Sequence, residues 1–162
     1  MLSFEINKQT SIIISGEWLK KIADTFYREN KLRGHWYFSL AFVDDKTIKK
    51  LNKTYRGKNK VTDVLSFEDN FENFIDLSSK EKYLGEIVIC VPQAKRQAKD
   101  VGCSLNNEVT RLLIHGLAHI SGYDHENVSK IEADKMLRLE KKILIKLKLW
   151  DVFKFEEEQI DD

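Results

Sequence analysis

The segment LNNEVTRLLIHGLAHISGYDH, residues 105–125, has the pattern of a long apolar helix followed by a sharp turn. Ser104 precedes it and can cap its first turn, while Gly122 can adopt the left-handed conformation that ends a helix. Apolar residues fill most positions between them, which predicts a buried helix rather than a surface one. We therefore expect the rest of the chain to pack around this helix.

Outward from this segment, strand-like and helix-like stretches alternate. Strands are predicted at 3–7 (an edge strand), 35–45, 62–68 (a core strand) and 83–91 (the central strand); further helices are predicted at 16–32, 46–56, 92–100 and 130–149. This order predicts an α/β fold of the mixed α+β kind, a small mixed sheet packed by about five helices. We expect a single domain over 1–150 and an acidic C-terminal tail over 151–162.

Length and composition exclude several classes of protein. The 162 residues are 42% hydrophobic and 33% charged, an ordinary globular balance with room for one core. The net charge of only +1 excludes a protein that is basic throughout. No signal pattern opens the chain and its apolar runs are too short to span a bilayer, so we expect a cytoplasmic protein with no membrane partner. Cys90 and Cys103 provide no disulfide framework.

Three of the chain's four histidines lie between positions 115 and 125. His115 and His119 are four residues apart, so their imidazoles share one helix face. Gly122 allows the chain to turn back, which brings His125 toward the same point. Three imidazoles so arranged predict a metal site, and the ligand type favours zinc. Three protein ligands leave one tetrahedral position for water, which is typical of catalytic rather than structural zinc.

This pattern is similar to the zincin arrangement, with one difference. Zincins carry a glutamate general base directly after the first histidine, where this chain has Gly116. That substitution argues against peptide hydrolysis by the usual route. Asp124 allows two interpretations, an acceptor that orients a metal ligand or an ordinary turn residue. His35 is interpreted as a residue at the edge of a strand.

A basic segment, KTIKKLNKTYRGKNK, covers residues 46–60. Asp44 or Asp45 can cap its helix, and Gly57 ends it. One helix face carries four lysines, Lys46, Lys49, Lys50 and Lys53. They form either a solvated surface or a stripe that contacts a phosphate backbone. Arg56 stands apart at the helix end, where its planar fork suits phosphate oxygens.

Three motifs together resemble the YbeY family of bacterial rRNA-maturation endoribonucleases. HGLAHISGYDH resembles the family signature H-G-x-L-H-L-x-G-Y-D-H, and LNKTYRGKNKVTDVLSFE resembles L-N-x-x-Y-R-x-x-x-x-x-T-D-V-L-S-F. LGEIVIC is similar to the family's L-G-D-I-x-I strand. The likeness runs from about residue 39 to residue 132, with the motifs in the family's order. It departs at Val61 and Glu68, where proline is common, and at Glu86 and Ala118.

The resemblance implies a zinc-dependent, single-strand-directed endoribonuclease, a hydrolase that acts in 16S rRNA 3′-end maturation and ribosome quality control. It implies His115, His119 and His125 as ligands of one zinc ion per chain, and Arg56 as the functional arginine. We accordingly assign catalytic roles to Arg56 and His115. The implied partners are precursor rRNA, the small ribosomal subunit and other processing or assembly factors. Two alternatives are a metallohydrolase with a non-RNA substrate and a non-catalytic, metal-stabilised ribosome-assembly factor.

Overall fold

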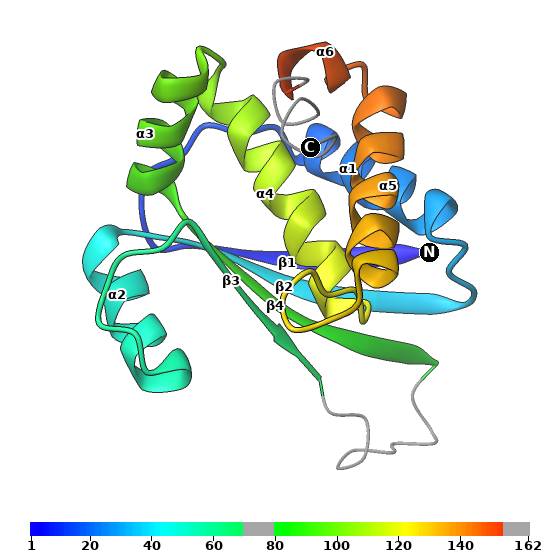
Figure 1. The fold of residues 1–162 in the computed structure, drawn as a ribbon, viewed down its shortest axis with the longest axis horizontal. Coiled ribbons are helices and arrows are strands. Elements are labelled where there is room, and N and C mark those ends of the chain that lie inside the picture. Colours follow the sequence, from blue (N-terminus) through cyan, green and yellow to red (C-terminus); the bar gives the residue numbers. More distant parts are fainter. Residues whose placement is uncertain (70–79, 154–162) are drawn as a thin grey trace.

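The computed structural model describes residues 1–69 and 80–153. Along the chain the elements are β1 (Leu2–Lys8), α1 (Gly16–Glu29), β2 (His35–Val43), α2 (Asp45–Arg56), β3 (Val64–Glu68), β4 (Glu81–Cys90), α3 (Val91–Val101), α4 (Leu105–Ile120), α5 (Lys130–Lys146) and α6 (Trp150–Phe153). The predicted mixed α/β class is confirmed, and the described part contains six helices where about five were expected (Figure 1).

The four strands form one mixed sheet in the order β1-β2-β4-β3. β1, β2 and β4 are parallel, and β3 pairs with β4 in the antiparallel direction. The edge position of β1 and the central position of β4 are confirmed. The expectation of a core strand at 62–68 was wrong in one respect, because β3 lies at the other edge of the sheet. Its apolar composition arises because Val64 packs on the core below one face while Leu65 is buried under the other.

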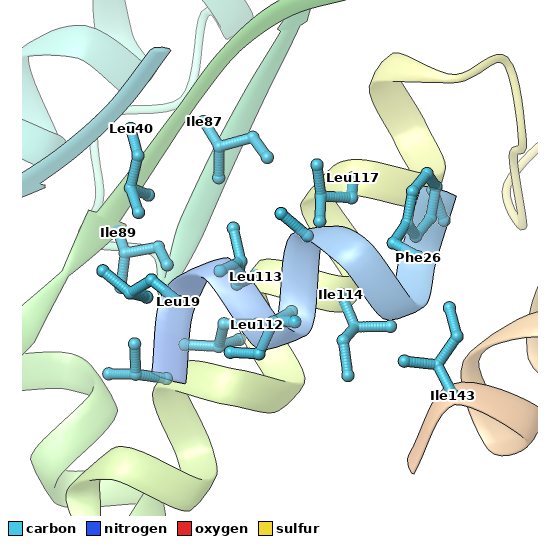
Figure 2. Close-up of a cluster of buried hydrophobic side chains, with 14 of the residues drawn as sticks. Leu19, Phe26, Leu40, Ile87, Ile89, Leu112, Leu113, Ile114, Leu117 and Ile143 are labelled. Atoms are coloured by element: carbon cyan, nitrogen blue, oxygen red, sulfur yellow. The ribbon is translucent and has the colours of Figure 1, made fainter. Parts of the chain in front are cut away.

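The sheet separates two hydrophobic clusters of different size. Alternate residues of β2 and β4 point to opposite faces, so Phe42 and Ile89 join the larger cluster while Val43 and Val88 join the smaller one. Helices α1 and α4 pack on the first face, α5 packs against both of these helices, and α2 lies against the second face (Figure 1). Figure 2 shows the larger cluster, in which the isoleucines of β4 face the leucines of α4.

Helix α4 is the buried helix that its sequence predicts. The Ser104 side chain accepts a hydrogen bond from the backbone N–H of Asn107, and most of the helix side chains are buried. The helix caps at Ser121, and Gly122 follows with a φ of 98°, which confirms the predicted turn. Helix α4 packs against β3 and β4, and its last turns place His115 and His119 in half-buried positions.

The C-terminal elements differ in detail from the predicted helix over 130–149. Helix α5 begins after the Ser129 cap and ends at Lys146, and the short helix α6 spans the expected domain boundary at residue 150. Phe153 is buried, so the packed part of the chain reaches at least that residue. Residues 154–162 of the expected tail, and 70–79 before β4, lie outside the described residues. Within the described ranges, no helix combines the length and the apolar character that a membrane crossing requires.

Candidate metal centre and adjoining cleft

The three histidines of the motif converge at the C-terminal end of α4. The Nε2 atoms of His115 and His119 lie 3.0 Å apart, and His125 brings its ring to within 5.1 Å of both other ring centroids. One nitrogen from each ring falls in a group whose members all lie within 4.8 Å of one another. The first two rings are half-buried and the third is exposed, so the group opens to solvent on the side of His125.

The outward-facing nitrogens of two rings already have acceptors. His115 Nδ1 lies 2.8 Å from Oε1 of Glu140, and His119 Nδ1 lies 3.1 Å from the carbonyl oxygen of Tyr123. Since both partners are acceptors, the proton of each neutral ring would lie on Nδ1 when a metal ion separates the two Nε2 atoms, which are 3.0 Å apart. The lone pairs of the Nε2 atoms therefore face the centre of the group, as metal coordination requires.

The surroundings of His119 favour the neutral form that a metal needs. Burial lowers the pKa of His119, and the neighbouring rings of His115 and His125 lower this pKa further. Only a neutral imidazole binds a metal, so the lowered pKa of His119 means that protons compete less with a metal ion for this ring. The donor type, the spacing and the ring orientations all fit a divalent transition metal with three protein ligands.

The absence of a zincin glutamate at position 116 has a structural cause. A Cβ atom on Gly116 would lie 2.8 Å from Cγ2 of Ile87 in β4. Helix α4 lies so close to Ile87 at this point that any side chain at position 116 would have to displace it, and position 116 faces the core rather than the histidines. A general base therefore cannot come from this position.

Asp124 serves the turn that carries His125. Its Oδ1 accepts hydrogen bonds from the backbone N–H groups of His125, at 2.7 Å, and Glu126, at 3.1 Å. These bonds lower the pKa of Asp124. Of the two interpretations left open by the sequence, the structure supports the turn aspartate. Tyr123, from the same turn, donates its hydroxyl proton to Asn30 at the end of α1.

Arg56 lies across a cleft from the histidines. Its Nη2 donates a 2.6 Å hydrogen bond to the carbonyl oxygen of Ser66 in β3, and its guanidinium carbon lies 5.3 Å from the Phe67 ring centroid. A cleft of about 740 Å³ is lined by Arg56 together with all three histidines. The structure thus brings together every catalytic and metal-binding residue predicted from the sequence.

The basic segment divides into two groups of lysines. Lys58 and Lys60, which follow α2, line the cleft. Lys46, Lys49, Lys50 and Lys53 are exposed along α2. The cap of α2 is Asp44, whose side chain accepts from the backbone N–H of Thr47, and Gly57 ends the helix with a φ of 69°. The lysines therefore extend a basic surface from the cleft along one helix.

Sequence reasoning missed two acidic residues that support the site. Glu140 touches His115, and Glu108 is fully buried on α4, where it accepts hydrogen bonds from Arg111 and Gln97. Gln97 also donates to Asp63 in the cleft wall. A signal for Glu140 exists in the sequence: it lies four residues after buried Met136 and three before buried Ile143, so it is a charge on the buried face of its helix.

Comparison with known proteins identifies the family. The family model described as Endoribonuclease YbeY matches residues 3–148. The chain belongs to the YbeY family. A relative from Sulfurihydrogenibium named Endoribonuclease YbeY is 39% identical over 143 residues, which cover 88% of this chain and 90% of that protein. A Thermodesulfovibrio yellowstonii protein of the same name is 40% identical and is covered over 95% of its length.

A solved structure has a similar fold. The solution structure of a Thermotoga maritima protein superposes with a TM-score of 0.56 and covers 91% of this chain and 92% of its own. Its sequence identity is 22%, so this likeness concerns the fold alone. The resemblance inferred from the three sequence motifs is confirmed at the level of the family, whereas the individual roles of Arg56 and His115 stay predictions.

Proposed function

We propose that this protein is a zinc-dependent endoribonuclease that cuts single-stranded RNA in 16S rRNA 3′-end maturation and ribosome quality control. One observation carries the proposal: a single cleft is lined by three histidines able to hold a metal and by an arginine suited to phosphate. The names of the YbeY relatives support RNA as the substrate.

The chemistry divides between the two sides of the cleft. His115, His119 and His125 would hold one zinc ion per chain, and zinc with three protein ligands supplies Lewis acidity and activates water near neutral pH. Arg56 acts on the phosphate. One of its N–H groups is committed to Ser66, and the remaining donors of the guanidinium can contact the phosphoryl oxygens as negative charge develops. His115 would contribute as one of the zinc ligands, through its Nε2 atom.

The basic surface supports binding of the RNA backbone. Lys58 and Lys60 lie in the cleft wall beside Arg56, and the exposed lysines of α2 continue this surface outward. Such a row neutralises successive phosphates without reading bases. Precursor rRNA, the small ribosomal subunit and other processing factors in the cytoplasm are the partners that the family resemblance implies.

Two other functions are separable from this one by experiment. A metallohydrolase acting on peptides is disfavoured because Gly116 faces Ile87 and offers no general base. A non-catalytic assembly factor would use the metal for folding alone. The open side of the histidine group at exposed His125 favours catalysis over this structural role.

Cleavage of precursor 16S rRNA by the purified protein is the deciding experiment. We expect cleavage in the presence of zinc, loss of cleavage with a chelator and recovery when zinc is restored. A peptide library incubated with the same preparation should stay intact. Peptide cleavage would favour the metallohydrolase, and zinc-dependent folding without cleavage of either substrate would favour the assembly factor.

A further inference from the structure

Glu140 of α5 is an acidic residue beside the cleft to which the proposed chemistry assigns no role. It lies outside the three motifs, yet its carboxylate meets His115 Nδ1 at 2.8 Å. We propose that Glu140 is a positioning residue, which holds the His115 ring with its proton on Nδ1 and its Nε2 lone pair toward the metal position. This inference rests on the metal-dependent function proposed above.

The charge on Glu140 decides which ring nitrogen of His115 carries the proton. The Glu140 side chain is 18% exposed and that of His115 is 25% exposed, so water competes weakly for their contact. If the His115 proton were on Nε2, the Nδ1 lone pair would face a carboxylate oxygen at hydrogen-bond distance. That arrangement is repulsive, whereas a proton on Nδ1 makes a charge-assisted hydrogen bond. The carboxylate therefore selects the tautomer in which Nε2 is ready to bind.

The two half-buried ligands have unequal supports. His119 Nδ1 faces a neutral backbone carbonyl, whereas His115 Nδ1 faces a carboxylate. A carboxylate makes the ring a stronger electron donor and brings a negative charge close to a divalent cation. Removal of Glu140 should therefore weaken metal binding more than loss of one hydrogen bond would suggest.

Helix α5 also offers a matched control for structural damage. Lys142, two residues along, forms a 3.0 Å ion pair with Glu29 of α1 and so ties α5 to its neighbour without contacting the histidines. Lys142→Ala removes a polar tether of α5 and leaves His115 with its carboxylate. Any effect that comes from a loosened α5 should appear in this variant as well.

Metal titration tests the proposal directly. Cobalt and zinc are added to metal-free protein in competition with a chromophoric chelator. We expect Glu140→Ala to bind each metal about 10–100-fold more weakly than the wild type. Glu140→Gln should be intermediate, because its amide oxygen can still accept from Nδ1 while its charge is gone. Lys142→Ala should match the wild type.

A measurement on metal-free protein separates this inference from the proposed function. The ¹⁵N shifts of the His115 ring above pH 8 should show the Nδ1–H tautomer in the wild type and a shift toward Nε2–H in Glu140→Ala. Three outcomes would overturn the role of Glu140 alone, provided that the wild type binds metal. These are an unchanged metal affinity in Glu140→Ala, an equal loss of affinity in Lys142→Ala, and an unchanged His115 tautomer in Glu140→Ala. A wild type that takes up neither metal would overturn the proposed function and this inference together.

Discussion

The two sides of the cleft rest on hydrophobic clusters of very different size. His115 and His119 extend from α4, and His125 follows in the turn after it; α4 is packed into the large cluster shared with α1, α5 and the sheet (Figure 2). Arg56 ends α2, which covers the smaller cluster of Ala41, Val43, Ile48, Leu65, Val88 and Cys90. Metal ligands tolerate little positional error, whereas a guanidinium on a long side chain adjusts to a phosphate. The larger hydrophobic cluster thus supports the histidines, whose positions must be the more exact.

The largest effect should follow from removing one of the proposed metal ligands on α4. His119→Ala leaves two imidazoles, one of them exposed, which hold a metal poorly. The metal content measured by elemental analysis should fall from about one metal per chain to near none, and RNA cleavage should fall to background. His35→Ala is the control, since it removes an exposed histidine at the start of β2. Full metal content in His119→Ala would contradict the three-ligand site.

Arg56→Ala should separate the role of the arginine from that of the histidines. A guanidinium has no lone pair to give a metal, so metal content should be unchanged. Cleavage should fall about 10²–10³-fold, the usual loss for one well-placed donor. Arg56→Lys should recover only part, because a point charge replaces a planar fork. Measuring metal content, Tm and cleavage on one preparation decides this, and near-full activity in Arg56→Ala would reduce the arginine to a helix-end contact.

Most of the arrangement of the candidate site could be predicted because it depends on local spacing. Residues four apart on a helix share a face whatever surrounds them, and a glycine after a helix end permits the turn that returns His125. The helix-end position of Arg56 is equally local. The sequence could therefore indicate both halves of the site before the fold was known.

The remainder depends on tertiary packing. Glu140 meets His115 from 25 residues away, and only the docking of α5 against α4 brings them together. The edge position of β3 was missed because two covered faces make an edge strand as apolar as a central one. The bond between Arg56 and the Ser66 carbonyl likewise depends on where β3 lies relative to α2.

Gly116→Ala tests how closely α4 packs against β4. Its Cβ would meet Cγ2 of Ile87, a β-branched side chain buried in β4. Overpacking of about 1–3 kcal/mol should exceed the helix-propensity gain of about 1 kcal/mol, so the free energy of unfolding should decrease. Denaturant titration measures this. In an Ile87→Ala background the same change should be neutral or favourable, and equal costs in both backgrounds would exclude this contact as the cause.

The lysines on the other side should contribute smaller, graded effects. Lys53→Ala removes one charge from the exposed face of α2 and should weaken single-stranded RNA binding modestly while metal content is retained. The slope of log affinity against log salt should become shallower by about 0.7 for one lost phosphate contact. Lys20→Ala, on exposed α1 surface, is the matched control. Equal slopes for Lys53→Ala and the wild type would assign this lysine to the solvated surface.

The smallest effect concerns the tether between α2 and α3. Arg96 pairs with Asp45 at 2.7 Å, but their side chains are 50% and 42% exposed, so solvent screens the pair. Arg96→Ala should lower Tm by at most about 2–4 °C at neutral pH, and less in high salt. The Arg96 hydrogen bond holds the pKa of Asp45 below its ordinary value of 3.8.

A depressed carboxyl pKa sets the sign of the pH dependence. The unfolded chain takes up the Asp45 proton first, so the pair stabilises the fold above about pH 3.8, and this contribution is lost as the pH falls through the lower folded-state pKa. The Tm difference between wild type and Arg96→Ala should therefore be present at pH 6 and disappear in acid. A difference that persists at pH 2 would mean that Arg96 acts through packing of its apolar stem rather than through its charge. In that case the support beneath Arg56 would depend on packing, as the support beneath the histidines does.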